Sequence, residues 1–472
     1  MSTNFVGRTA DLARLDEDLA RVRKTGEGAF ITIRGRRRIG KSRLVEHWLA
    51  QRRLRHVFFS SPAATPIKDL ELFRDSVVAS SLPSATTAGG ISFNRWQSAL
   101  AFAATGATKA KPLVVVIDEF PYLLTRQDEH EVETGVQHAW DRTLEKLPVL
   151  LVLIGSDIRM METLATHGRA LFGRPTREMV MDPLTPRELG GLLKLSPIDA
   201  IDAYLIVGGF PGIVKRWSAG ADMWSFLRVA LNDSESSLIV NGERILSAEF
   251  PSDLQPRAIL KAIGTGETTF TNIQRAAGIP QATVDRALRT LTAQKRIVLA
   301  PTPLSTKPSD EKRYVVGDPY LRFWLRFIEP ALPELDRGRG DLVLERIRAE
   351  WGTYRGRAVE PLVRDSVSRL LPDDRFGDAR YVGGYWTRSN VPVVDLVGVP
   401  SQKPKRVSFI GSIKWRDDGP FTDQDLRALS SVAPAVPGTD GKTLLVGVAR
   451  SRFEGKGPDV ALLSADLIAA WR

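Results

Sequence analysis

The chain of 472 residues contains no cysteine, which excludes disulfides, thiolate catalysis and cysteine zinc sites together. It also lacks any hydrophobic run near the ~18 apolar residues that a membrane-spanning helix needs. Residues Met1 to Asn4 show neither the basic region nor the apolar stretch of a signal peptide. From these absences we expect a soluble, cytoplasmic protein with no membrane partner.

The composition is that of an ordinary globular protein, with 43% hydrophobic and 26% charged residues. Its length predicts roughly three domains at about 150 residues each. A net charge of +11 and a pI near 9.8 make an anionic partner plausible, with nucleic acid as the first candidate.

The most informative segment is GRRRIGKS at 35–42, which follows the apolar run 29–33 and precedes a helical stretch at 43–49. A G-x-x-x-x-G-K-[ST] sequence between a strand and a helix is a phosphate-binding loop. Its glycines let backbone N–H groups point at phosphates, Lys41 reaches the β- and γ-phosphates, and the Ser42 hydroxyl ligates Mg²⁺. We expect the nucleotide to contact Gly35, Arg36, Arg37, Arg38, Ile39, Gly40, Lys41, Ser42 and Arg43. The side chains of the three consecutive arginines are expected to face solvent or an anionic partner.

Two carboxylates follow the apolar run LVVVI at 113–117. Open α/β sheets place their sites at the carboxyl ends of strands, where Asp118 would hold Mg²⁺ through water and Glu119 would polarise the attacking water. This pair is typical of ATPases, and the chain has no [NT]-K-x-D match of the correct length for reading guanine. The sequence therefore predicts ATP and Mg²⁺ as cofactors.

Two further residues are candidates for the catalytic site. Ser156 ends the next apolar strand, 150–154, and could hydrogen-bond the γ-phosphate or the water; a plain turn residue is the alternative. Arg174 and Arg169 precede a further strand at 178–181, where an arginine finger would lie, although a solvated arginine is equally consistent.

Strands alternating with helical segments predict a parallel α/β sheet, followed from Thr185 by helices. Between 257 and 316 the pattern is that of a winged helix-turn-helix, with helices at 258–264, 271–278 (Thr271 as N-cap) and 280–294. A hairpin of 297–299 with 313–316 follows. The third helix would read DNA through Gln281, Thr283, Arg286 and Arg289; a protein-contact element is the alternative for this module. Lys295, Arg296, Lys307, Lys312 and Arg313, in and around the wing, suit phosphate contacts.

Several of these segments resemble the archaeal-type P-loop ATPases of the STAND/AAA+ group. The matching pieces are FVGR (5–8), GRRRIGKS, VVVIDEF (114–120), LIGS (153–156), LFGRPT (171–176) and YLIVGGFPGIV (204–214). The resemblance implies that the Gly-x-Pro at 209–211 lies on a helical lid near the nucleotide, with Pro211 in contact. RYVVGDPYLRFWLRFIEP (313–330) is similar to the signature that opens the DUF234 region of the same family.

That C-terminal region resembles the PD-(D/E)xK nuclease fold, which implies a catalytic set of Glu360, Asp395 and Lys414. Ser412 stands where the family pattern has Glu, and Val394 replaces another acid. Mg²⁺ would bind weakly without that carboxylate, and Asp417 or Asp418 would have to replace it. We therefore expect a degenerate nuclease-like α/β domain.

The predicted fold is α/β: a P-loop NTPase parallel sheet at 1–182, a helical lid at 183–250, a winged helix-turn-helix at 251–330 and a nuclease-like domain at 331–472. The leading hypothesis is an ATP-hydrolysing switch whose C-terminal half engages double-stranded DNA. One alternative is an ATP-gated, metal-dependent DNA nuclease. Another is a regulatory interaction module, of a signalling or toxin/antitoxin-like kind, in which ATP sets assembly with a protein partner or by self-association.

Overall fold

The computed structural model describes residues 5, 7–62, 64–124, 129–250 and 254–471. The chain divides into two compact units, Met1–Pro183 and Leu184–Arg472. The boundaries expected at 250 and 330 fall inside the second unit and stay predictions. None of the described helices is long and apolar enough to cross a membrane.

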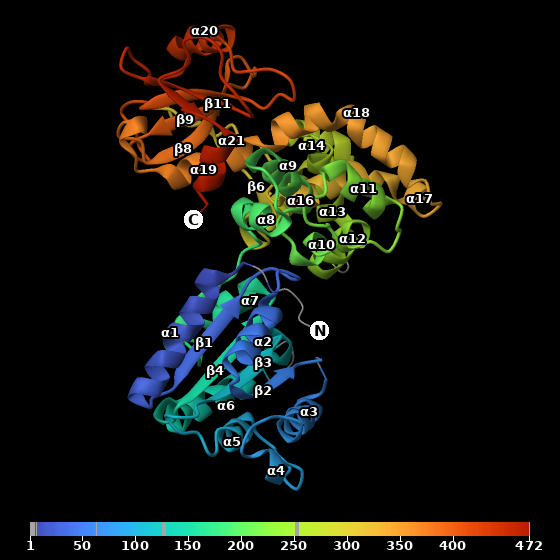
Figure 1. Ribbon diagram of the computed structural model, residues 1–472, viewed down its shortest axis with the longest axis vertical. Coiled ribbons are helices and arrows are strands. Elements are labelled where there is room, and N and C mark those ends of the chain that lie inside the picture. Colours follow the sequence, from blue (N-terminus) through green and yellow to red (C-terminus); the bar gives the residue numbers. More distant parts are fainter. Residues whose placement is uncertain (1–4, 6, 63, 125–128, 251–253, 472) are drawn as a thin grey trace. The chain divides into compact units, whose positions relative to one another are not determined.

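The first unit is built on a five-stranded sheet with the order β2-β3-β4-β1-β5, all strands parallel (Figure 1). Its strands are β1 (Ala29–Arg34), β2 (Arg55–Ser60), β3 (Leu113–Asp118), β4 (Val149–Gly155) and β5 (Arg177–Val180). Its helices are α1 (Thr9–Thr25), α2 (Lys41–Arg52), α3 (Pro66–Val78), α4 (Ala85–Ala88), α5 (Trp96–Ala103), η1 (Phe120–Leu124), α6 (Glu129–Arg142), η2 (Leu144–Lys146) and α7 (Ile158–Leu164). The strand order and the strand–loop–helix at 29–52 are those of a P-loop NTPase, as the sequence predicts.

The core of this unit explains why the apolar runs become strands. All residues of β3 and β4 are buried because helices cover both faces of the sheet, as in other parallel sheets. Alternate strand residues such as Phe30, Val115 and Leu151 pack with α3, α5 and α6 on one face. On the other face α1 contacts β1 and β4 and lies beside α2.

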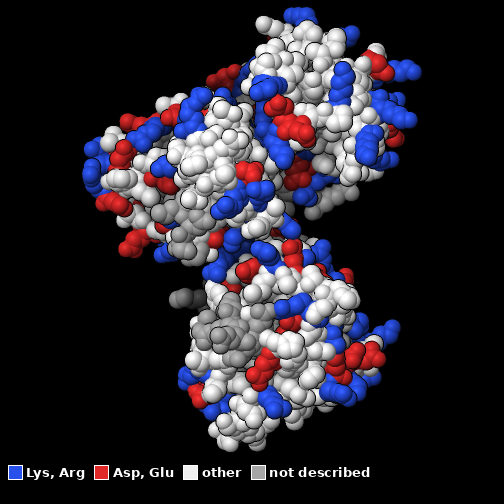
Figure 2. Space-filling model, turned by 180° about the vertical axis from the view of Figure 1, so that it is seen from behind, with Lys and Arg blue, Asp and Glu red and all other residues white. Residues whose placement is uncertain are grey.

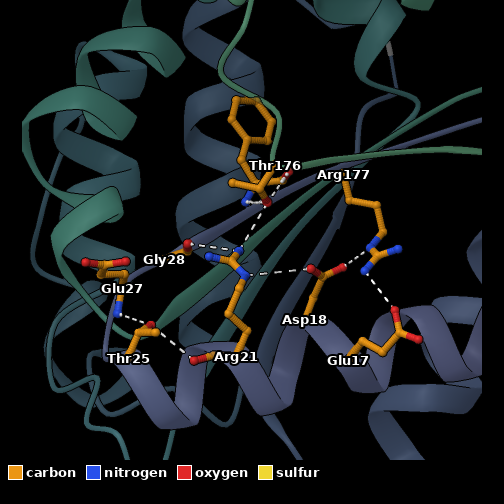
Figure 3. A network of polar contacts seen from close by, with 9 residues as sticks. Glu17, Asp18, Arg21, Thr25, Glu27, Gly28, Thr176 and Arg177 are labelled. Carbon is orange, nitrogen blue, oxygen red and sulfur yellow. Dashed lines mark hydrogen bonds and ion pairs between the residues drawn. The ribbon is translucent and has the colours of Figure 1, made fainter.

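A polar network holds α1 to the edge of this sheet (Figure 3). Arg177 of β5 forms an ion pair with Asp18 of α1. One turn further along α1, Arg21 donates to the Thr176 hydroxyl (3.3 Å) and to the Gly28 carbonyl (3.4 Å). These contacts join α1 to the start of β1 and to β5. They therefore hold the first helix of the unit against its last strand.

The second unit begins with helices and continues into a small three-helix segment with a hairpin. Its first helices are α8 (Pro186–Leu193), α9 (Pro197–Val207), α10 (Pro211–Val214), α11 (Met223–Leu231) and α12 (Ser237–Glu249). The three-helix segment comprises α13 (Leu254–Gly264), α14 (Phe270–Ala277), α15 (Gln281–Arg289), the π-helical turn η3 (Thr290–Gln294), and the antiparallel strands β6 (Val298–Leu299) and β7 (Val315–Val316). The three helices and the hairpin follow one another in the order that the sequence predicts.

The N-cap of α14 differs from the expectation. Thr271 lies inside the helix, whereas Thr269 has extended backbone angles and its side chain accepts from the Asn272 N–H at 3.4 Å. A capping side chain must precede the first helical turn, and Thr269 is the residue in that conformation. The expected N-cap was therefore two residues too late.

The rest of the unit packs helices beside a mixed sheet of order β12-β11-β10-β9-β8. The helices are α16 (Pro319–Phe323), η4 (Trp324–Ile328), η5 (Glu329–Ala331), α17 (Leu332–Leu335), α18 (Gly340–Ala358), α19 (Glu360–Leu370), η6 (Asp374–Phe376), α20 (Asp423–Val432), η7 (Ala433–Ala435) and α21 (Ser464–Ala469). The strands are β8 (Tyr381–Trp386), β9 (Val393–Val399), β10 (Phe409–Lys414), β11 (Leu444–Ala449) and β12 (Val460–Leu462). β10, β11 and β12 run parallel, while β8 and β9 are antiparallel to their neighbours, so this part is α/β as expected.

Candidate functional site

The phosphate-binding loop lies between β1 and α2, and its two glycines are required by its geometry. A Cβ at Gly35 would lie 2.3 Å from the Met181 carbonyl oxygen and 2.5 Å from Ile39 Cδ1. Gly40, the N-cap of α2, has a φ of 92°, in the left-handed region that favours glycine. The loop can therefore turn sharply into α2 with its backbone close to any bound anion.

Lys41 opens α2, and its side chain folds back over the loop. Its ammonium group donates to the carbonyls of Gly35 and Arg36, both at 2.9 Å. Burial lowers the pKa of Lys41 to about 8, against the opposing pull of the Glu119 and Asp118 carboxylates. A buried ammonium held mainly by carbonyl oxygens is poised to exchange them for phosphate oxygens, which are stronger partners.

The residues expected to hold Mg²⁺ lie together at the carboxyl end of β3. The Ser42 hydroxyl donates to Asp118 Oδ2 at 2.7 Å, and the Glu119 N–H donates to Oδ1 at 2.9 Å. Burial raises the pKa of Asp118, while its hydrogen bond from Ser42 acts in the opposite direction. Mg²⁺ is usually bound by one or two such oxygens together with phosphates, so this pair fits a magnesium ion.

Ser156, at the tip of β4, contacts Glu119. Its hydroxyl donates to Glu119 Oε2 at 2.7 Å, and Ser156 is itself buried. Glu119 has a φ of 52°. Non-glycine residues adopt this conformation rarely, and those that do are often at functional sites. The sequence suggested that Ser156 would bind phosphate or water, whereas here it orients the expected catalytic carboxylate.

Two arginines support the loop in ways that the sequence did not indicate. Arg37 was expected to face solvent or an anion, but its guanidinium donates to the Tyr122 hydroxyl at 2.8 Å. Arg8, beyond the left-handed Gly7, is buried and donates to the carbonyl of Ile39 at 3.2 Å. The FVGR motif was the available signal for Arg8, although spacing alone gives it no role.

Arg36, Arg38 and Arg43 keep their expected places along the loop and the first turn of α2. Arg38 is exposed, and the other two are half-buried. All three make polar contacts within the protein.

Arg174, the expected arginine finger, is paired with a carboxylate in this structure. Its guanidinium makes two hydrogen bonds of 2.8 Å to the carboxylate of Asp141 in α6, and it also donates to the Ala170 carbonyl at 2.7 Å. Arg169 is paired with the buried Glu133 in the same helix, at 2.6 Å. Both arginines therefore anchor the segment before β5 to α6.

Pro211 is the first residue of α10 in the second unit, so its contact with nucleotide stays a prediction. Gly209 has a φ of 74°, and its carbonyl accepts from the Leu184 N–H at 2.9 Å. Phe210 packs edge-on against Tyr320, with ring centroids 5.6 Å apart. The Gly-Phe-Pro turn is thus joined directly to the segment that resembles the DUF234 signature.

The expected DNA-reading residues lie along α15. Gln281, Arg286 and Arg289 are exposed, and Thr283 is half-buried. Arg289 is paired at 2.5 Å with Asp285, which is also exposed. Val284 and Leu288 hold the opposite face of the helix in the core, so the polar face is available.

The wing differs from the expectation because it is docked on the C-terminal sheet. Arg313, expected to contact phosphate, lies over the Trp386 ring at 4.6 Å and donates to Asn390 Oδ1 at 2.6 Å. The Leu304 N–H donates to the Gly384 carbonyl at 2.8 Å, and Trp386 Nε1 donates to the Glu311 carbonyl at 2.9 Å. Arg313 is consequently removed from the set of phosphate ligands.

The nuclease-like residues Glu360 and Asp395 lie near one another, and an arginine joins the Glu360 carboxylate to the Asp395 backbone. Arg364 of α19 donates to Glu360 Oε2 at 2.9 Å and to the Asp395 backbone carbonyl at 2.9 Å. The Asp395 carboxylate accepts from the Ile413 N–H at 2.8 Å and from the Ser412 hydroxyl at 3.3 Å. Burial raises the pKa of Glu360, with Arg364 opposing the shift.

The other expected members of that set have different partners. Lys414 lies 3.8 Å from Asp425 of α20. Asp417, a candidate replacement acid, pairs with Arg355 at 2.6 Å instead. Among the described residues, no group of three or more His, Cys, Asp or Glu side chains is arranged to hold a metal ion.

Comparison with known proteins identifies the C-terminal region. Residues 324–429 match the model of DUF234, archaeal and bacterial proteins of unknown function. The chain is also 24% identical over 429 residues to an uncharacterized protein of Methanocaldococcus jannaschii, and the match covers 90% of each.

Similar solved structures include two archaeal proteins. A Walker-type ATPase of Pyrococcus abyssi is 18% identical and has a TM-score of 0.47; the match covers 68% of this chain and 96% of that one. The ORC2 protein of Aeropyrum pernix, in ADPNP–ADP complexes, is 14% identical with a TM-score of 0.46, over 74% and 98% of the two chains.

Proposed function

We propose that this chain, which joins a P-loop ATPase fold to a DUF234 region, is a Mg²⁺-dependent ATP-hydrolysing switch. The observation that carries the proposal is the contact of Ser42 with Asp118, at 2.7 Å, beside a buried Lys41. Two carboxylates, a hydroxyl and an ammonium lie together at the end of an apolar strand. These are the groups that bind Mg²⁺ and the phosphates of a nucleotide.

The residues divide the chemistry among them. Backbone N–H groups of the loop and Lys41 would bind the phosphates, and Ser42 and Asp118 would hold the metal, which when bound neutralises the charge that develops on the phosphates. Glu119 would orient the attacking water and accept its proton. Ser156 would keep Glu119 in place through its 2.7 Å hydrogen bond.

Turnover of ATP by the purified full chain tests this proposal. We expect Lys41→Ala to lose ATP binding, and Glu119→Gln to retain ATP binding while turnover falls by a factor of about 10² or more. Arg53→Ala, at the far end of α2, is a matched control that removes a positive charge outside the loop. ATP turnover unchanged in Lys41→Ala would refute the proposal.

Engagement of double-stranded DNA by the winged-helix elements is the second part of the proposal. It is supported by the exposed face of α15, which carries Gln281 and Arg286. We expect Arg286→Ala to weaken duplex binding, and the same substitution at Arg275 of α14 to have a smaller effect. If these elements bind a protein and not DNA, the wild-type chain will not bind the duplex.

The nuclease alternative is disfavoured by Arg364, whose guanidinium lies between Glu360 and the Asp395 backbone. A cation fixed at this place repels a metal ion and already neutralises the carboxylate. Incubation of supercoiled DNA with the protein and Mg²⁺ or Mn²⁺ is expected to leave the DNA intact. Nicking that disappears in Asp395→Asn would restore the nuclease hypothesis.

A further inference from the structure

One end of the C-terminal sheet collects basic side chains from segments that are far apart in the sequence. β8 and β9 are antiparallel, as are β9 and β10, while β10 and β11 are parallel. The starts of β8, β10 and β11 and the end of β9 therefore meet at the same end. This end, which we call the basic end, carries Lys307, Arg380, Lys403, Lys405, Arg406 and Lys442.

Hydrogen bonds of the backbone hold these segments side by side. The Arg380 N–H donates to the Val399 carbonyl at 2.8 Å, which places it beside the loop that bears Lys403 and Lys405. The Thr443 hydroxyl donates to the Val407 carbonyl at 3.2 Å, which joins the segment of Lys442 to the same loop.

The wing contributes the remaining lysine. The Thr306 N–H donates to the Pro437 carbonyl at 3.2 Å, and the neighbouring Gly438 carbonyl accepts from the Val407 N–H at 2.8 Å. Lys307 therefore extends the basic end beyond the sheet itself.

Basic side chains outnumber acidic ones at this end by six to three. All six basic residues are exposed. Among these six, and counting only partners in the described parts of the chain, Arg406 forms an ion pair, with Asp378 at 2.6 Å. The other acids there, Asp440 and Asp459, accept hydrogen bonds from the backbone N–H groups of Lys442 and Leu445. Figure 2 shows Lys and Arg side chains gathered along the flank of this domain, at the right of the view.

We propose that the basic end binds the phosphate backbone of double-stranded nucleic acid, independently of α15. Four neighbouring strands span about 14 Å at a spacing of about 4.8 Å. A duplex carries roughly one negative charge per 1.7 Å of its axis, so about eight phosphates, on both strands together, lie along that length. The loops 400–407 and 437–443 are polar and contain no aromatic residue, while Tyr381 at the start of β8 is an exposed aromatic side chain. The predominance of lysine and arginine at this end fits phosphate contacts better than the aromatic anchors of a protein interface.

Binding of a labelled duplex to the full chain, followed by anisotropy between about 50 and 200 mM salt, tests this inference. The variant combines Lys403→Gln, Lys405→Gln and Lys442→Gln. We expect weaker binding. The slope of the logarithm of the binding constant against the logarithm of the salt concentration should be shallower by about 0.9 for each lost phosphate contact. The control combines Lys194→Gln, Lys215→Gln and Lys456→Gln, which are exposed and outside the basic end, and it should leave the salt dependence unchanged.

Four outcomes overturn the inference, and they can be told apart from failure of the proposed function. An equal loss in both triple variants means that general positive charge is responsible. Loss in Arg286→Ala with none in the basic-end variant leaves α15 as the DNA site. Absence of duplex binding in the wild type refutes both DNA surfaces, while ATP turnover still decides the ATPase. Binding of polyglutamate in place of the duplex identifies an acidic protein as the partner.

Discussion

At the scale of single residues, the ammonium of Lys41 is the group on which the proposed nucleotide site depends. It is buried, and its pKa of about 8 results from desolvation that the nearby carboxylates only partly offset. Phosphates would favour the charged form and raise this pKa. Binding of ATP therefore takes up a proton when the solution is more alkaline than the pKa of the free protein.

The affinity for ATP is expected to depend on pH in one direction. Below about pH 8 Lys41 is already charged, so the dissociation constant should be nearly constant. Above that pH each unit should weaken binding by up to about tenfold, until the pKa of the bound state is reached. Titration with a fluorescent ATP analogue from neutral to alkaline pH measures this.

Lys41→Arg is the matched control, because a guanidinium stays charged throughout that range. The dissociation constant of this variant for ATP, even if larger at every pH, should not rise at alkaline pH. Identical pH profiles for the wild type and the Lys41→Arg variant would contradict a lowered pKa at this position.

At the scale of elements, Arg174 ties the segment before β5 to α6. Its two hydrogen bonds to Asp141 are bidentate, and its side chain is 26% exposed. An arginine finger would contribute a factor of about 10³ to 10⁵ to turnover. A structural arginine contributes to the stability of the folded unit instead.

We expect Arg174→Ala to lower the free energy of unfolding by about 1 kcal/mol and to change ATP turnover by less than a few fold. Asp141→Ala should have the same effect on stability, because it removes the other half of the pair. Urea unfolding and steady-state turnover of both variants provide the measurement. A turnover that collapses in Arg174→Ala but not in Asp141→Ala would return the finger role to Arg174.

The elements also show what the sequence could reveal. The strands β3 and β4 and the loop at 35–42 were predictable because their patterns are local: buried β-branched runs, and glycines at fixed spacing. Arg313 and Arg364 were not, because their partners Trp386 and Asp395 lie far along the chain. No local period encodes such contacts; they arise when α19, the wing and the C-terminal sheet pack together.

At the scale of the whole molecule, a buried ionic cluster joins the first helices of the second unit to its C-terminal sheet. Asp202 of α9 accepts from Arg355 of α18 at 3.2 Å and from Arg450, after β11, at 2.8 Å. Trp415 Nε1 also donates to it, at 3.3 Å. Asp202 and Arg355 are almost fully buried, so α9, α18 and the sheet are linked as one body.

We expect Asp202→Ala to destabilise the second unit by about 2 kcal/mol, because it removes the buried carboxylate that Arg355 and Arg450 share and leaves them only the largely exposed Asp417. Asp341→Ala removes a partner from an exposed pair with Arg339 and should cost less than about 1 kcal/mol. Chemical unfolding of the full chain compares the two. Equal, small losses would mean that the cluster does not hold these elements together.

The most direct test of the account is ATP turnover by the full chain with and without duplex DNA. In an ATP switch whose C-terminal half engages DNA, the binding of nucleotide and the binding of DNA are coupled. We expect this coupling to appear as a change in the rate of ATP turnover. We expect Mg²⁺-dependent turnover that rises several-fold with duplex and is absent in Lys41→Ala under both conditions. Turnover that is indifferent to DNA at concentrations where the duplex is bound would contradict it.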